Sequence, residues 1–169
     1  MPPHRVNHRN KRPKSTESPP KAVGISHLPD DLALGDVIGH GMNAEELRTN
    51  PRLSRWFVQD LNRDPRLPLT DASLDAVLAC VGVQYLQRPL EVFAEVARVL
   101  RPGGRVVVSF SNRCFPTKAI RAWLSLDMEG RAALVAHYLE RAGLAEVEAL
   151  ALADARRGDP LVVVQGHRA

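Results

Sequence analysis

The sequence predicts an α/β fold, a parallel sheet with crossover helices, from three observations. From Asp36 onward, short apolar runs of strand character alternate with segments whose apolar residues recur at helical spacing. Two of the runs, 74–83 (LDAVLACVGV) and 105–110 (RVVVSF), are almost continuously apolar, as expected for strands buried on both faces of a parallel sheet. The segment between these two runs has the length and pattern of a crossover helix.

Length and composition are those of one globular domain. The chain has 169 residues, of which 44% are hydrophobic and 25% are charged, and this is enough to bury a core. No apolar run approaches the roughly 20 residues that cross a bilayer, so we expect no membrane association. The two cysteines, Cys80 and Cys114, are too few for a disulfide framework and lack metal-ligand spacing, which favours a cytoplasmic protein.

Residues 1–22 differ in character from the rest of the chain. Residues 1–21 hold six basic residues and one acidic residue, a net charge of +5, whereas the whole chain carries +4, which leaves −1 for the remainder. This proline-rich, charged segment predicts a disordered basic tail, followed by a domain over 23–169. Binding of nucleic acid through the tail is an alternative, which the absence of aromatic residues in the tail disfavours.

The first regular elements are short. DVIGHG (36–41) predicts a strand, and Asn43 after it is a candidate N-cap for a helix that begins at Ala44. Pro51 stops this helix after a few residues. RWFVQDL (55–61) predicts the next strand, and a polar loop follows it.

The central segment predicts a strand, a helix and a strand. The strand over 74–83 is followed by Pro89, which suits the first turn of a helix because its missing N–H costs nothing there. We expect Gly103 and Gly104 to end this helix by allowing positive φ, and 105–110 to form the next strand. One buried helical face is predicted to carry Leu90, Phe93, Val96, Ala97 and Leu100.

The last third of the chain predicts two helices and a pair of strands. Pro116 opens a helical region that runs to Trp123, and a second helix extends to Gly143. The apolar runs 147–152 and 161–166 are candidate paired strands on either side of the turn-forming sequence ARRGDP.

The order of motifs between Asp60 and Asn112 indicates a family. An acidic residue ends a strand at Asp60, LPLTDASLDAV (67–77) leads into the next strand, and a helix closes on RVLRPGG (98–104) before a third strand. This order resembles the C-terminal half of a class I S-adenosylmethionine-dependent methyltransferase of the type 11 kind. The resemblance covers about residues 25–169. It implies a Rossmann-like methyltransferase sheet with helices on both faces, the cofactor S-adenosylmethionine, and methyl transfer to a small-molecule acceptor.

The resemblance implies a cofactor site in which Asp60 accepts a hydrogen bond from the adenine amino group. Its place at the end of a parallel strand agrees with where ligands bind in such sheets, although an Asp there can also cap local backbone N–H groups. Met42 and Leu61 would lie on either side of the adenine. The segment from Val81 to Gln84 would frame the reacting sulfonium.

The turn after 36–41 departs from the family pattern. The resembled enzymes place a carboxylate for the ribose hydroxyls at the end of this strand, where this chain has Gly41, preceded by Gly39 in a GHG sequence. Glycine cannot accept those hydrogen bonds. Asn43 is either a weak substitute or simply the N-cap of the next helix.

The acceptor site implied by the resemblance contains Tyr85, Asn112 and Arg113. Tyr85 follows the strand over 74–83, and the other two leave the strand over 105–110 at the same edge of the sheet. Methyl transfer is an in-line displacement in which positioning supplies much of the catalysis. No residue is therefore assigned as catalytic.

The central first strand of the family is missing or reduced to a stub. The resembled enzymes end that strand in a glycine-rich turn, but the corresponding PPKAVGISHLPDD (19–31) holds a single glycine. KAVGI (21–25) could supply a short stub, and 25–29 looks like the tail of a divergent version of the motif. We therefore expect a truncated N-terminus, from a gene-start or frameshift artefact. A non-catalytic methyltransferase remnant that has lost cofactor binding is the alternative function.

Overall fold

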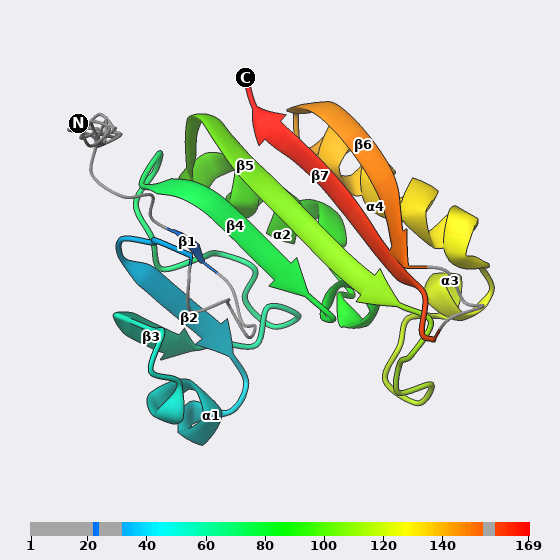
Figure 1. The fold of residues 1–169 in the computed structure, drawn as a ribbon, viewed down its shortest axis with the longest axis horizontal. Helices are drawn as coiled ribbons and strands as arrows, with labels where there is room; N and C mark the ends of the chain where they lie inside the picture. Colours follow the sequence, from blue (N-terminus) through cyan, green and yellow to red (C-terminus); the bar gives the residue numbers. More distant parts are fainter. Residues whose placement is uncertain (1–21, 24–31, 154–157) are drawn as a thin grey trace, which may run out of the picture.

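The protein forms one mixed seven-stranded sheet with helices packed on it, in a computed structural model that describes residues 22–23, 32–153 and 158–169 (Figure 1). The described strands follow the order β3-β2-β1-β4-β5-β7-β6, and β7 runs antiparallel to both of its neighbours. The elements are β1 (Ala22–Val23), β2 (Val37–Gly41), α1 (Ala44–Thr49), β3 (Arg55–Val58), β4 (Leu74–Cys80), a 3₁₀ turn η1 (Val83–Tyr85), α2 (Pro89–Val99), β5 (Leu100–Ser111), α3 (Arg121–Leu124), α4 (Met128–Arg141), β6 (Leu144–Ala153) and β7 (Leu161–Arg168).

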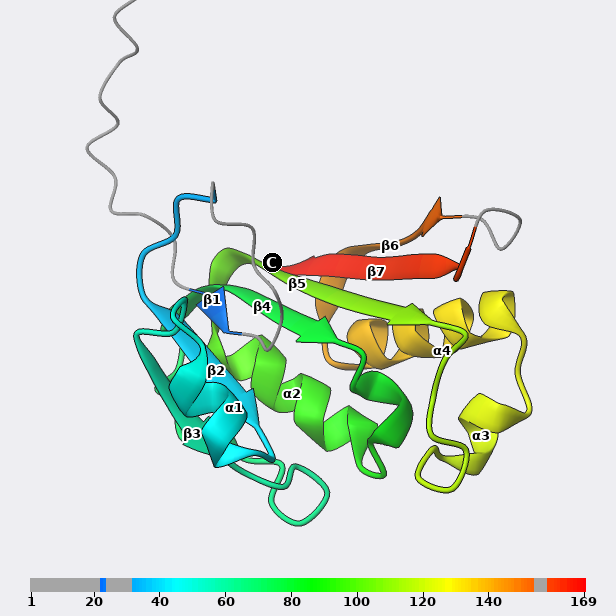
Figure 2. The same cartoon turned by 60° about the horizontal axis from the view of Figure 1, so that its bottom comes forward.

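Helices lie on both faces of the sheet, as predicted, but they cover the faces unequally. Helices α2 and α4 lie side by side on one face, under β4, β5 and β7 (Figure 2). Ile38 of β2 points into the core on that side, and its neighbour Gly39 points to the other side, where a Cβ atom would meet Leu47 of α1. Helix α1 therefore covers the second face at β2 and β3.

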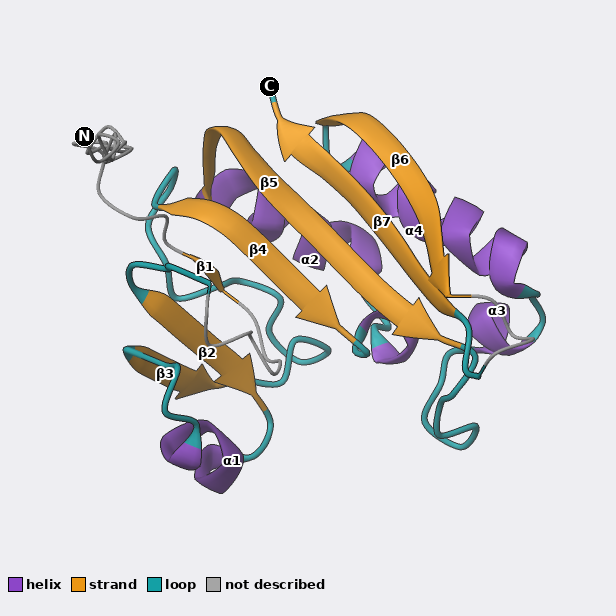
Figure 3. Cartoon of the chain, in the orientation of Figure 1, coloured by secondary structure: helices purple, strands orange, loops and turns teal. Residues whose placement is uncertain are grey.

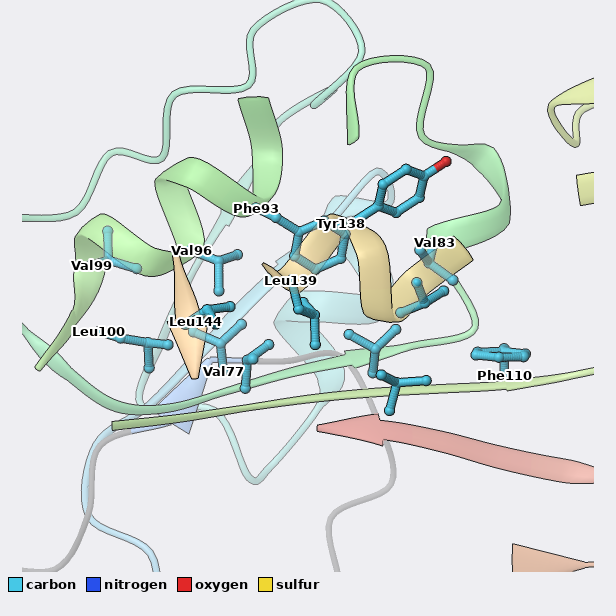
Figure 4. Packing of buried hydrophobic residues seen from close by; sticks show 14 of the residues in the cluster. Val77, Val83, Phe93, Val96, Val99, Leu100, Phe110, Tyr138, Leu139 and Leu144 are labelled. Carbon is cyan, nitrogen blue, oxygen red and sulfur yellow. The ribbon is translucent and has the colours of Figure 1, made fainter. Parts of the chain in front are cut away.

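The hydrophobic core fills the space between the sheet and the pair α2 and α4 (Figure 4). The rings of Phe93 and Tyr138 stack across the two helices at 6.1 Å, and the ring of Phe110 meets Trp123 edge-on at 4.9 Å. All four side chains are buried. Buried residues alternate with more exposed ones along β5 and β7, as expected for strands that turn one face to this core.

The central strand β1 is a stub of two residues, as the sequence predicts (Figure 3). It pairs in parallel with Val37 and Ile38 of β2 on one side, and with Ala76 and Val77 of β4 on the other. Of the predicted basic tail, residues 1–21 lie outside the described part of the chain, as does the 25–29 segment. The turn at 155–160 is described from residue 158 onward.

Several element boundaries differ from the prediction because tertiary contacts set them. The strand predicted over 55–61 ends at Val58, where the backbone turns around the carbonyl of Asp60. The run predicted over 74–83 leaves the sheet at Cys80 and continues as the η1 turn. The helix predicted over 116–123 is confined to α3, after a turn.

The helix α2 also ends earlier than its glycines suggest. Its last residue is Val99, and β5 begins at once with Leu100, so that both glycines lie in the strand. Gly103 does adopt positive φ (76°), in the irregular start of β5. Leu90, predicted to be buried, is exposed, because Val92, Phe93, Val96 and Val99 form the inner face.

Within the described residues, every helix is too short or too polar to cross a membrane.

Candidate cofactor-binding site

A cavity of about 350 Å³ lies at the carboxyl ends of β2 and β4, between these strands, the loop after β3 and helix α2. This is the edge at which open α/β sheets bind ligands. The cavity brings together six of the predicted site residues, which are Gly41, Met42, Asp60, Leu61, Val81 and Tyr85. Outside its lining lie Gly39, Asn43, Gln84, Asn112 and Arg113.

The cavity lies beyond the residues at which β1 pairs with its two neighbours. Among the described residues, β1 fills the space between β2 and β4 only as far as Ile38 and Val77. Beyond that point the two strands continue to Gly41 and Cys80, and their last residues line the cavity. The cavity therefore occupies the place at which the resemblance predicts the end of a longer first strand.

Asp60 is held in a defined orientation at the start of the loop after β3. Its Oδ1 accepts a hydrogen bond from the backbone N–H of Asn62 (3.0 Å), and its carbonyl accepts from Arg63 and Asp64 (both 3.0 Å). Asn62 in turn donates from Nδ2 to the carbonyl of Tyr85 (3.0 Å). Asp60 therefore does cap local N–H groups, while its Oδ2 accepts no hydrogen bond from the described residues. The carboxylate thus retains acceptor capacity toward a ligand.

His40 is a cavity residue that the sequence analysis did not identify. Its ring packs on Phe57 with the centroids 5.1 Å apart, and its Nε2 lies 2.9 Å from the carbonyl of Gln59. Burial lowers the pKa of His40 below 6.5, and the hydrogen bond to the Gln59 carbonyl opposes this shift in part. The neutral ring is therefore favoured. The signal available in the sequence was its position between two glycines at a strand end.

Gln59 extends this contact into the loop that carries Asp60. Its side-chain amide donates to the carbonyls of Asp64 (2.8 Å) and Arg66 (2.7 Å). The contacts of His40 and Gln59 thus connect β2 to the whole 59–66 loop. This network fixes the loop relative to the end of β2, on the opposite side of the cavity from β4.

Hydrogen bonds connect the segment LPL (67–69) to helix α2 and the start of RVL (98–100). Arg98 donates to the carbonyls of Leu69 (2.9 Å) and Leu67 (3.1 Å), and Glu95 accepts from the N–H of Leu67 (3.0 Å). Pairing with Glu95 and Asp71 raises the pKa of Arg98, and pairing with Arg98 lowers the pKa of Glu95. These bonds place Leu67 against the cavity, beside the apolar face of α2.

Val81 has an unusual backbone conformation at the floor of the cavity. Its φ is +51°, a region that a β-branched residue adopts only under strain. Its N–H donates to the carbonyl of Ser109 (2.9 Å), which anchors it to β5, and its side chain is 53% exposed. The strained turn directs the chain away from the sheet and into η1.

Three of the predicted cofactor residues, Asn43, Gly39 and Gln84, lie outside the cavity lining. Asn43 is the N-cap of α1, because its Oδ1 accepts from the N–H groups of Glu45 (3.0 Å) and Glu46 (3.5 Å). Gly39 lies in β2 where a Cβ would come within 2.3 Å of the Leu53 side chain. Gln84 is only 1% exposed, and its Oε1 has no hydrogen-bond partner among the described residues.

The predicted acceptor residues lie on the side of the cavity toward β5. Tyr85 lines the cavity, and its hydroxyl accepts from the N–H of Phe115 (2.9 Å). Arg113 forms an ion pair with Asp159 (2.6 Å), and both Arg113 and Asn112 are exposed.

The residues present fit a nucleoside cofactor in part. The cavity volume falls within the range of about 300–1,000 Å³ that small-molecule sites occupy. Asp60 presents a carboxylate oxygen for an amino group, and Met42 and Leu61 provide apolar surface close to it. At Gly41 the chain offers no side-chain acceptor for ribose hydroxyls.

Known proteins with this architecture define the fold as a Rossmann-like methyltransferase fold. A Haloferax volcanii methyltransferase, solved in complex with the activator Trm112, superposes with a TM-score of 0.66 and 20% identity, over 89% of this chain and 82% of that one. Phosphoethanolamine N-methyltransferase 2 of Haemonchus contortus, solved with S-adenosyl-L-methionine, gives a TM-score of 0.63 and 10% identity, over 92% of this chain and 50% of that one.

Sequence comparison identifies the family. Residues 31–108 match the family model of the methyltransferase domain. A malonyl-[acyl-carrier protein] O-methyltransferase of Marinomonas is 40% identical over 62 residues, which are 37% of this chain and 23% of that protein. The match thus spans about a quarter of that relative. The cofactor predicted from the sequence, S-adenosylmethionine, is confirmed for the family.

Proposed function

We propose that this chain binds S-adenosylmethionine in the cavity between β2 and β4 and transfers its methyl group to a small-molecule acceptor. The observation that supports this proposal is the convergence of Asp60, Met42, Leu61 and Val81, from separate parts of the chain, on one cavity. When bound, the cofactor supplies an electrophilic methyl group on a sulfonium. Asp60 would hold the adenine amino group, and Val81 would frame the reacting end.

The chain would contribute positioning to the reaction. A nucleophilic atom of the acceptor forms a bond to the methyl carbon while the carbon–sulfur bond breaks, the sulfur keeps the electron pair, and the acceptor's proton passes to solvent. Alignment of the reacting atoms can supply a large part of such a rate enhancement. Residues on two sides of the cavity could provide this alignment. Tyr85 lies on the side toward β5, and Asp60 lies on the side toward β3.

A non-catalytic protein is the second candidate, and two observations favour it. Among the described residues, β1 does not extend beyond its partners Ile38 and Val77, whereas the resemblance implies a longer first strand. Gly41 stands where the family holds the ribose hydroxyls with a carboxylate. Both features remove contacts to the cofactor, and a folded chain without affinity for the cofactor would result.

Calorimetric titration with S-adenosylhomocysteine distinguishes the two functions. We expect binding by the wild type and a loss of about tenfold or more in Asp60→Ala, since a hydrogen bond to a charged group contributes about 1.5–3 kcal/mol. Asp60→Asn is the matched control for the loop, because its amide oxygen can still accept from Asn62. The same loss in Asp60→Asn, with unchanged stability, assigns the effect to the carboxylate. A folded wild type that gives no heat supports the non-catalytic protein.

A further inference from the structure

The loop after β5, residues 112–120, is hydrogen-bonded at two points to η1, the turn that carries the cavity residue Tyr85. The N–H of Phe115 donates to the hydroxyl of Tyr85 (2.9 Å), and the N–H of Ile120 donates to the carbonyl of Gln84 (3.0 Å). Tyr85 lines the cavity. The loop therefore lies beside the cavity, at the edge where β4 and β5 end (Figure 1).

This loop presents an aromatic ring next to a positive charge. The side chain of Phe115 is 67% exposed, and its ring centroid lies 6.4 Å from that of Tyr85. The ammonium of Lys118 lies 5.7 Å from the Phe115 centroid, within the range of about 6 Å for attraction to the face of a ring. Lys118 is also the single lysine after residue 21.

The charge of Lys118 remains available, whereas that of its neighbour Arg113 does not. Arg113 is paired with Asp159 at 2.6 Å. No carboxylate of the described residues pairs with Lys118. The hydroxyl of Tyr85 accepts from Phe115 through its oxygen and keeps its own hydrogen to donate. An exposed ring, an ammonium and a hydroxyl donor therefore meet beside the cavity.

We propose that Tyr85, Phe115 and Lys118 form the acceptor site and select an anion with a flat, apolar body, of the class of aromatic carboxylates. This inference rests on the proposed methyl transfer and names the class of its acceptor. The flat body would pack on Phe115, and the carboxylate would bind Lys118. The hydroxyl of Tyr85 would donate to a polar group of the acceptor on the side toward the cavity.

The test uses two probes of one shape and different charge. Naphthalene-2-carboxylate and the neutral naphthalene-2-carboxamide are titrated into the full chain, in the presence and in the absence of S-adenosylhomocysteine, and followed by probe fluorescence. The variants are Lys118→Gln, Phe115→Leu and, as a control for general positive charge, Arg121→Gln on the exposed first residue of α3. Binding of S-adenosylhomocysteine is measured separately for each variant.

We expect the wild type to bind the carboxylate more tightly than the carboxamide. Lys118→Gln should weaken binding of the carboxylate by about threefold or more and leave the carboxamide unchanged, in keeping with the worth of partly exposed charge pairs. Phe115→Leu should weaken both probes, and Arg121→Gln neither.

Two results overturn the inference. One is equal binding of the two probes by the wild type, and the other is an equal effect of Lys118→Gln and Arg121→Gln on the carboxylate. Failure of the proposed function has a different signature. In that case the wild type does not bind S-adenosylhomocysteine, while the discrimination between the probes still depends on Lys118 and shows an anion site without methyl transfer.

Discussion

The sheet has a half with long strands, β4 to β7, and a half with short strands, β1 to β3. Strands β4 to β7 have 7, 12, 10 and 8 residues, whereas β1 to β3 have 2, 5 and 4. In the main hydrophobic cluster of the described residues, Ile38 alone comes from β1, β2 or β3, and Val37 of β2 is buried outside that cluster. Most of the stabilising apolar burial therefore belongs to the segment from Leu67 onward.

The candidate site draws on both halves, and this difference has a consequence for function. The side of the cavity formed by β4 and α2 rests on a closely packed core, while Asp60 and Gly41 rest on short strands. The contacts of His40 and Gln59 compensate in part, because they hold the 59–66 loop to β2. We infer that the shorter half determines the cofactor affinity, and that the longer half determines the free energy of unfolding.

The largest expected difference is in the free energy of unfolding, between a glycine-to-alanine substitution in the longer half and one in the shorter half. A Cβ on Gly104 would lie 2.8 Å from the carbonyl oxygen of Arg101 and 3.2 Å from that of Asp75, both backbone atoms. A Cβ on Gly39 would meet the ends of the Leu53 and Leu47 side chains, which can shift. Gly104→Ala should lower the free energy of unfolding by about 2–3 kcal/mol, and Gly39→Ala by about 1 kcal/mol or less. Urea unfolding followed by circular dichroism measures both.

A smaller effect of opposite sign is expected at the strained turn of the longer half. Val81→Gly relieves the positive φ at little packing cost, since the side chain is half exposed, and should stabilise the protein by up to about 1 kcal/mol. Val58 is the control, because it is similarly exposed but lies in the regular strand β3. Val58→Gly should destabilise by about 1 kcal/mol. A loss of stability in Val81→Gly would show that the turn is not strained.

The sequence predicts the order of elements well, because apolar periodicity records which faces are buried. The strands β2, β4 and β5, the helices α2 and α4, and the pair β6 and β7 all follow from it. The turn at Val81 could not be predicted, since a valine with positive φ contradicts local preference and depends on its bond to Ser109.

The contents of the site were predicted in part for a similar reason. Asp60 and Met42 follow strand ends that the pattern locates, and both line the cavity. Gln84 sits at a predicted strand end as well, but the η1 turn takes its side chain into the interior. The importance of His40 depends on a contact with Gln59, 19 residues away, which periodicity does not report.

The smallest expected effect is a dependence on pH that belongs to the shorter half. Burial lowers the pKa of His40 in the folded state below the ordinary value of 6.5, so folding favours the neutral ring. The stability from this group is fully present above pH 6.5 and is lost as the pH falls from 6.5 through the folded-state pKa. The free energy of unfolding should therefore fall between pH 7.5 and pH 5.5 by more in the wild type than in His40→Gln. Equal changes in the two proteins would show that folding does not shift the pKa of His40 and that other groups cause the pH dependence.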